Sequence, residues 1–209
     1  KTVPTLHISQ LRIHHIGPLS FTIQAGECFV ISGPSGSGKT LTMRAIADLE
    51  PHEGDFSLDR CKSTDISAAE WRQQVGLLTA ESAWWFERIG DHFPNLKNKQ
   101  IFDSTWFEKL GFGLDALDWE VSRCSTGERQ RLALLRLLAH EPRALLLDEP
   151  TASLDPHNVL QTEEIIAIYR ETCGAPVLWV SHDPEQIKRI AGTYLYFEEG
   201  VLREKVIHV

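Results

Sequence analysis

The sequence is poor in cysteine. Its 209 residues include four, which lie far apart and form no C-x-x-C pair: Cys28, Cys61, Cys124 and Cys173. This spacing disfavours a disulfide scaffold and a structural zinc site, so we expect reduced thiols in a cytosolic protein.

Long apolar segments are also missing. Residues 1–10 contain no apolar core of a secretory signal peptide, and the richest apolar stretch, residues 132–139, is interrupted by Arg136. A membrane-spanning helix needs about 20 mostly apolar residues, and no segment approaches that length. We therefore expect any membrane role to depend on a partner protein.

Basic residues are outnumbered by acidic ones. The chain has 21 Lys and Arg against 29 Asp and Glu, for a net charge of -8 and a pI near 5.6. Proteins that wrap nucleic acid need a basic surface to neutralise phosphates, so no nucleic-acid partner is expected, although a local basic groove is compatible with an acidic total. Repeats and low-complexity linkers are absent too, and the length suits one domain carrying a small subdomain.

Short apolar runs alternate with helical patterns over most of the chain. Strands are expected at residues 28–32, 55–58, 75–78, 144–147 and 177–180. Helices are expected after the first of these strands, from Ser67, in the leucine- and arginine-rich segment before residue 140, and over residues 159–170 and 184–190. Strands that alternate with helices predict an α/β fold with a mainly parallel sheet, flanked by helices on both faces.

Both ends of the chain carry a different pattern. Residues 6–23 form short alternating runs broken at Gly17-Pro18, which predict a small N-terminal antiparallel sheet. Residues 193–206 alternate around Glu199-Gly200 and predict a terminal hairpin.

The middle of the chain is rich in aromatic residues and has no β-branched runs. From about residue 81 to residue 123 we therefore expect an inserted helical subdomain. The whole chain, residues 1–209, would be a single domain whose core comprises residues 1–80 and 124–209.

A glycine-rich segment between the strand at residues 28–32 and the following helix fits the pattern G-x-x-x-x-G-K-[ST]. It consists of Gly33, Pro34, Ser35, Gly36, Ser37, Gly38, Lys39 and Thr40. Small residues let backbone N–H groups wrap phosphates, and the helix N-terminus favours anions. We expect Lys39 to reach the β- and γ-phosphates and the Thr40 hydroxyl to ligate Mg²⁺. By itself, this loop predicts a nucleoside triphosphate site.

Polar residues follow two of the later apolar runs. Asp148 and Glu149 come directly after one of them, and in a phosphate-loop fold Asp148 is expected to hold Mg²⁺ while Glu149 activates the attacking water as a general base. His182 follows the strand at residues 177–180. A lone histidine can be an ordinary surface or core residue, but the place of His182 after a third strand suggests a polar group aimed at the γ-phosphate.

The order of these segments resembles that of the ATP-binding cassette (ABC) ATPase family. The phosphate loop is followed by Ser-Thr-Gly-Glu-Arg-Gln-Arg at residues 125–131, Leu-Leu-Leu-Asp-Glu-Pro-Thr at residues 145–151, Ser-Leu-Asp at residues 153–155, and His182. The resemblance covers nearly the whole chain. It implies a P-loop NTPase fold of the ABC type, with ATP as the nucleotide and Mg²⁺ as its metal ion.

The resemblance also implies a dimer, which we expect to be a homodimer. Ser125, Gly127 and Glu128 belong to a segment that looks like the family's signature motif, LSGGQ, which closes over the γ-phosphate of ATP on the opposite subunit. Asp155 matches the loop that crosses the dimer interface. Two ATP molecules would then lie between two nucleotide-binding domains.

Further roles are implied by the same resemblance. Glu149 matches the family's catalytic glutamate, His182 its switch histidine, and Lys39 its phosphate-loop lysine, so these three residues are the expected catalytic groups. The helical subdomain matches the part of the family that touches a membrane permease.

The signature and the metal site depart from the family pattern. Thr126 replaces the first glycine of the signature, and Glu128 replaces its glutamine. Ser125 and Glu128 also form a capping box, so the segment equally fits an ordinary N-capped helix, and both readings can hold together. The glutamine that couples Mg²⁺ to the permease contact should fall near Ala80, where Glu81 is the nearest replacement and a possible metal ligand.

Two aromatic features are left open. His14 or His15 could stack on adenine, and a solvated histidine pair explains them equally well. The cluster Trp84-Trp85-Phe86 fits either core packing or a hydrophobic patch for a permease helix.

We therefore expect a subunit that binds and hydrolyses ATP and powers substrate transport through a separate membrane permease. It would be cytoplasmic and held on the inner face of the cell membrane by that permease. The alternative is a soluble, non-transport ABC ATPase that acts on nucleic acid or the ribosome, which the acidic balance disfavours. A phosphate-loop kinase of small molecules would leave residues 125–131 and His182 unexplained.

Overall fold

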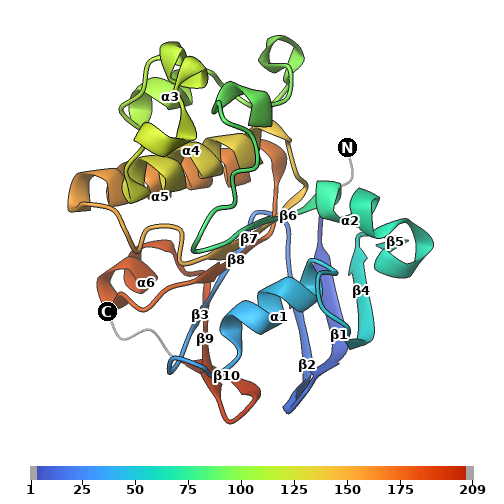
Figure 1. Ribbon diagram of the computed structural model, residues 1–209. Helices are drawn as coiled ribbons and strands as arrows, with labels where there is room; N and C mark the ends of the chain where they lie inside the picture. Colours follow the sequence, from blue (N-terminus) through green and yellow to red (C-terminus); the bar gives the residue numbers. More distant parts are fainter. Residues whose placement is uncertain (1–3, 206–209) are drawn as a thin grey trace.

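The computed structural model describes residues 4–205 of the chain (Figure 1). Residues 1–3 and 206–209 lie outside this range. They include the start of the N-terminal segment considered above and Val206, the last residue of the predicted hairpin.

A six-stranded sheet runs through the middle of the molecule (Figure 1). Its strands are β3 (Cys28–Ser32), β6 (Val75–Leu78), β7 (Ala144–Asp148), β8 (Val177–Val180), β9 (Thr193–Glu198) and β10 (Val201–Lys205). They lie in the order β10-β9-β3-β8-β7-β6, and every neighbouring pair is parallel except β9 and β10, which form an antiparallel hairpin. The predicted parallel sheet and hairpin are both confirmed.

This sheet separates two hydrophobic cores, because alternate residues of a strand point to opposite faces. In β7, Leu145 and Leu147 belong to one core, while Ala144 and Leu146 belong to the other. All four side chains are fully buried. Strands buried on both faces have continuous apolar sequences, which is why their positions were predicted well.

Helices cover both faces of the sheet (Figure 1). One core packs against α1 (Lys39–Ile46) and α2 (Ala68–Gln74), and the other against α4 (Thr126–Ala139), α5 (Pro156–Cys173) and α6 (Pro184–Ile190). Leu49 lies beyond the end of α1 and is 42% exposed. Of the helices within residues 4–205, none combines the length and apolar character needed to cross a bilayer.

The predicted antiparallel sheet is also present, and it packs on the core that contains α1. Its strands, in spatial order, are β2 (Ile16–Ile23), β1 (Leu6–Ile13), β4 (Glu53–Leu58) and β5 (Cys61–Lys62). Ile16, at the start of β2, packs against Gly38, so the turn between β1 and β2 lies beside the glycine-rich loop.

The segment between β6 and α4 is helical only in short pieces. It contains η2 (Gly90–His92), η3 (Leu96–Asn98), α3 (Thr105–Lys109), η4 (Leu114–Asp118) and η5 (Val121–Arg123). Glycine and proline, such as Gly111 with φ of 81° and Pro94, interrupt longer helices there. Trp106 and Phe107 are buried in the core under α4 and α5.

The cluster Trp84-Trp85-Phe86 is partly packed against the core and partly exposed as a hydrophobic surface. Trp84 is half-buried and packs against the core, with its ring centroid 4.9 Å from that of His92. Trp85 and Phe86 are 65% and 51% exposed, and their backbone N–H groups donate to Nε2 of His92. The side chain of His92 therefore orders an apolar surface that is open to solvent.

Candidate nucleotide site

The glycine-rich loop connects the buried strand β3 to α1, as predicted. Gly33, Gly36 and Gly38 all have positive φ, a conformation that side chains rarely adopt. A Cβ atom on Gly38 would lie 2.2 Å from Cδ1 of Ile16, and one on Gly33 would lie 2.5 Å from the carbonyl oxygen of Phe197. The loop thus needs glycine both for its backbone conformation and for its close packing on the fold.

The N-terminus of α1 is open to an anion. Gly38 caps the helix without any side-chain hydrogen bond to its N–H groups. The first N–H groups of a helix have no partner within the helix, and together with the helix dipole they favour negative charge. This arrangement suits phosphate oxygens.

Lys39 folds back over the loop. Its Nζ donates to the carbonyl oxygens of Gly33 at 2.9 Å and Pro34 at 2.7 Å, and the residue is only 6% exposed. Burial lowers the pKa of the Lys39 ammonium, and the nearby carboxylates of Glu149 and Asp148 oppose that shift. A buried ammonium group beside two carboxylates can exchange its carbonyl partners for phosphate oxygens.

Asp148 ends β7 and is 3% exposed. Burial raises the pKa of its carboxyl group. A hydrogen bond with the Thr40 side chain and the positive charge of Lys39 offset part of this rise. Carboxylate and hydroxyl oxygens are ligands that Mg²⁺ accepts, usually alongside water and substrate phosphates. The two residues therefore fit the predicted metal site.

Glu149 and His182 meet across the ends of β7 and β8. Oε1 of Glu149 lies 3.1 Å from Nε2 of His182, and the Glu149 N–H donates to the carbonyl oxygen of Val180 at 3.2 Å. Glu149 has a φ of 48°, an uncommon value for a residue other than glycine. The bend turns its side chain away from the strand and towards His182 at the carboxyl edge of the sheet, where open α/β folds bind ligands.

One cavity brings Lys39, Thr40, Glu149 and His182 together. It has a volume of about 380 Å³, and Ser35, Gly36 and Gly38 of the glycine-rich loop also line it. The rest of its wall is formed by His15, Ile16, Leu41 and Arg44. Leu41 and Arg44 were not predicted to take part, although Arg44 follows Thr40 by one helical turn and so shares its face of α1. His15 lines this cavity, whereas His14 lines a neighbouring hollow.

The signature-like residues lie apart from this cavity. Ser125, Gly127 and Glu128 begin α4 and are not among the described residues that line it. The Ser125 N–H donates to Oε2 of Glu128 at 2.7 Å, and Oγ of Ser125 accepts from the Glu128 N–H at 3.2 Å. The hydrogen bond from the Ser125 N–H to its carboxylate lowers the pKa of Glu128. The predicted capping box is therefore confirmed.

Glu81 is also outside the cavity. It is exposed, and its carbonyl oxygen accepts a hydrogen bond from the Thr79 hydroxyl at 2.7 Å. The structure thus does not bring it together with Thr40 and Asp148.

Known proteins resemble this chain in sequence. A family model described as ABC transporter matches residues 16–152. Protein STAR1 of Oryza sativa subsp. japonica is 38% identical over 176 residues, which are 81% of this chain, and the chain spans only 51% of STAR1. The phosphate import ATP-binding protein PstB of Aeropyrum pernix is 34% identical over 207 residues, covering 90% of this chain and 82% of PstB.

Solved structures show the same fold. An ATP-binding cassette in a dimeric, post-hydrolysis state bound to ADP and Pi matches with a TM-score of 0.79 at 20% sequence identity, over 98% of this chain and 99% of that one. At this identity the match shows the fold alone.

Proposed function

Since this chain belongs to the ABC transporter family, we propose that it is an ATP-hydrolysing subunit that powers substrate transport through a separate membrane permease. The observation that carries the proposal is the cavity in which the pair of Glu149 and His182 faces Lys39 and the glycine-rich loop. An anion cradle opposite a general-base candidate is what phosphoanhydride hydrolysis requires.

In this proposal, the phosphate-binding residues are those of the glycine-rich loop. Backbone N–H groups of residues 33–40, except Pro34, which has none, and the Lys39 ammonium would hold the phosphates. His15, which lines the cavity, would stand beside the adenine ring. Thr40 and Asp148 would hold Mg²⁺, which neutralises phosphate charge when bound. Glu81 stays a proposed metal ligand that would have to approach when the nucleotide binds.

Hydrolysis is assigned to the pair at the strand ends. Glu149 would take the proton from the water that attacks the γ-phosphate, and His182, held 3.1 Å from that carboxylate, would donate a hydrogen bond to the transferring group. Because both side chains are partly exposed, water can reach them. The products are ADP and phosphate.

The second half of each site is proposed to come from a second copy of the chain. Ser125, Gly127 and Glu128 form a helix tip at which Ser125 is exposed and the other two are half-buried, and none of the three lines the cavity of its own protomer. A helix N-terminus is an anion site, so on a partner protomer it could close over the γ-phosphate. The dimeric state of the matching cassette is consistent with this arrangement.

Mixing two inactive variants tests whether the site is shared between protomers. Lys39→Ala disables the cradle, and Gly127→Asp places a negative charge at the helix tip. If the site is shared, the mixture should regain up to about a quarter of wild-type phosphate release, because half of randomly formed dimers would contain one intact site of two.

The control mixture combines Lys39→Ala with Glu149→Gln. Both substitutions lie on the cradle side, so no dimer then contains an intact site, and activity should stay at the level of the separate variants. A Lys39→Ala and Gly127→Asp mixture that is no more active than its components would contradict the shared site.

The transport role is tested by what the protein binds and releases. Wild-type protein with ATP and Mg²⁺ should release free phosphate, whereas a kinase would transfer it to an acceptor. When isolated with its native partners, the chain should co-purify with a membrane protein that has several spans, and the exposed Trp85 and Phe86 are the proposed contact. Recovery with ribosomes or nucleic acid instead would favour the non-transport alternative.

A further inference from the structure

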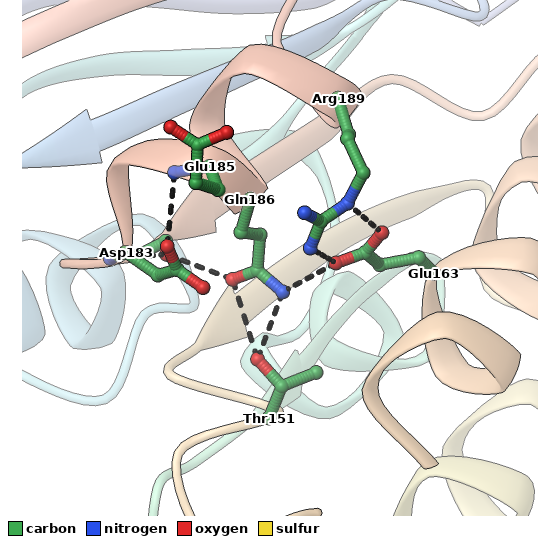
Figure 2. Close-up of polar contacts among 7 residues, drawn as sticks. Thr151, Glu163, Asp183, Glu185, Gln186 and Arg189 are labelled. Atoms are coloured by element: carbon green, nitrogen blue, oxygen red, sulfur yellow. Dashed lines mark hydrogen bonds and ion pairs between the residues drawn. The ribbon is translucent and has the colours of Figure 1, made fainter. Parts of the chain in front are cut away.

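A buried polar cluster includes Thr151, two residues after Glu149, and Ser181, which directly precedes His182. Figure 2 shows the contacts of Gln186 with Thr151 and Glu163 in this cluster. At its centre is Gln186 on α6, which is 2% exposed. Its partners are Thr151 and Ser181, 9% and 4% exposed, and Glu163 on α5, 9% exposed. Four polar side chains from four segments are thus removed from water, and such groups are costly unless they are fully hydrogen-bonded.

The contacts of Gln186 determine which way its amide points. Nε2 donates to Oε1 of Glu163 at 2.8 Å and to Oγ1 of Thr151 at 3.0 Å. A carboxylate can only accept, so the NH₂ group must face Glu163. Oε1 of Gln186 then faces Ser181, whose hydroxyl donates to it at 2.7 Å. The site therefore needs one side chain that donates at one end and accepts at the other.

Arg189 holds the side chain of Glu163 in place. Its Nε and Nη2 donate to the two carboxylate oxygens of Glu163 at 2.9 Å and 2.8 Å, as Figure 2 shows. These hydrogen bonds raise the pKa of the Arg189 guanidinium. A two-point contact of this kind fixes the carboxylate in space, and so gives Gln186 a rigid anchor on α5.

Through Ser181, the amide of Gln186 reaches the loop that carries His182. Oγ of Ser181 also accepts from the Asp183 N–H at 3.2 Å, so one hydroxyl is tied to the residues on both sides of His182. The Asp183 side chain in turn caps α6 by accepting from the Glu185 N–H at 2.9 Å. The position of the His182 backbone thus depends on Gln186.

Through Thr151, the same amide reaches the loop that carries Glu149. The Ala152 N–H donates to the Glu149 carbonyl oxygen at 3.2 Å, which closes a tight turn with Thr151 inside it. The two loops have no other side chain in common in this cluster than Gln186. The amide of Gln186 therefore links the two loops that carry Glu149 and His182, whose side chains approach to 3.1 Å.

We propose that Gln186 is a positioning residue, which holds Glu149 and His182 at the mutual distance that ATP hydrolysis requires. The inference rests on the proposed function. Gln186 is not among the residues lining the nucleotide cavity, so it acts through the two loops and not on the nucleotide.

The first test replaces Gln186 by leucine. Gln186→Leu keeps the size of the side chain and removes every hydrogen bond, and kcat for ATP hydrolysis should fall about 10- to 100-fold while KM for ATP changes less than about twofold. Amide hydrogen exchange at residues 151–152 and 181–183 should become faster. Glu185→Gln, on the same helix with a side chain 70% exposed, is the matched control and should behave as wild type.

The second test uses Gln186→Glu, which has the same shape. The new carboxyl group would face Glu163 on α5. The other charged or titratable groups around it are Arg189 and Glu185 on α6, His182 and Asp183 just before α6, and Glu149, two residues before Thr151. Two carboxyl groups in contact share one proton, so the pKa of the pair is raised. At low pH the protonated form can donate to Glu163 as the amide does, and at high pH the two charges repel.

The ratio of the Gln186→Glu kcat to the wild-type kcat should therefore fall as the pH rises. A ratio that is independent of pH would overturn the proposal, and so would a folded Gln186→Leu protein with wild-type kcat. Equal losses of kcat and ATP affinity together with a lower unfolding temperature would also overturn it, because they indicate a purely structural residue. If wild-type protein did not hydrolyse ATP, the proposed function would fail, and hydrogen exchange would still report whether Gln186 orders the two loops.

Discussion

The variant Glu149→Gln is expected to bind ATP as tightly as wild type and to hydrolyse it about 10²- to 10⁴-fold more slowly. The amide has the shape of the carboxylate and can still form a hydrogen bond to His182, so the 3.1 Å contact and the cavity should persist. It cannot take a proton from water. The loss should therefore fall on kcat alone.

Phosphate release and nucleotide binding measure these two quantities separately. A fluorescent ATP analogue gives the affinity, and single-turnover release of phosphate gives the rate of the chemical step. Glu171→Gln, on the exposed face of α5, serves as a control for the loss of one acidic group and should leave both unchanged. Undiminished turnover in Glu149→Gln would remove this residue from the role of general base.

The local parts of the site could be predicted from the sequence, because each depends on a few consecutive residues. The phosphate loop needs glycine at positions of positive φ, as at Gly33 and Gly38, and the pattern shows those glycines directly. The apolar run of β7 likewise marks Asp148 as a residue at the end of a buried strand. The capping box of Ser125 and Glu128 is readable for the same reason.

Contacts between distant segments could not be predicted in this way. Glu149 and His182 meet because β7 and β8 are neighbours with Asp148 opposite Val180, and no pattern within one strand specifies its neighbour or register. Gln186 has no signal at all, since an isolated polar residue on a short helix is normally exposed. Its burial follows from the fold, which places Glu163 and Thr151 beside it.

The helical subdomain shows a different limit. Its aromatic content predicted an inserted helical subdomain, and Trp106 and Phe107 from this segment join the main core. Aromatic content alone does not specify helix length, however, and glycine residues such as Gly111 divide the segment into short turns. The backbone conformation there is set by packing on α4 and α5 more than by local propensity.

Lys39→Ala is expected to weaken ATP binding by about 100-fold or more. Removing one partner of a buried, charge-assisted contact costs roughly 2–5 kcal/mol, and each 1.4 kcal/mol is a factor of ten in affinity. The loss should be severe here because Asp148 and Glu149 would remain near the phosphates without the compensating ammonium. Titration with a fluorescent ATP analogue measures the loss, and the exposed Lys97→Ala is a control for charge.

Thermal unfolding separates this effect from misfolding. Burial lowers the pKa of Lys39 below its unfolded value, so holding the charge in the folded protein costs stability at neutral pH, and this cost fades as the pH rises above the folded pKa. The substitution also removes the hydrogen bonds from Lys39 to the carbonyl oxygens of Gly33 and Pro34, which acts in the opposite direction, so the nucleotide-free Lys39→Ala protein should unfold near the wild-type temperature. Bound ATP stabilises a protein by RT ln(1 + [ATP]/Kd), so the ATP-induced rise in Tm should be much smaller in the variant, and it should vanish at ATP concentrations well below the variant's Kd. A rise equal to that of wild type would contradict the phosphate-binding role of Lys39, because the variant would then bind ATP without its ammonium group.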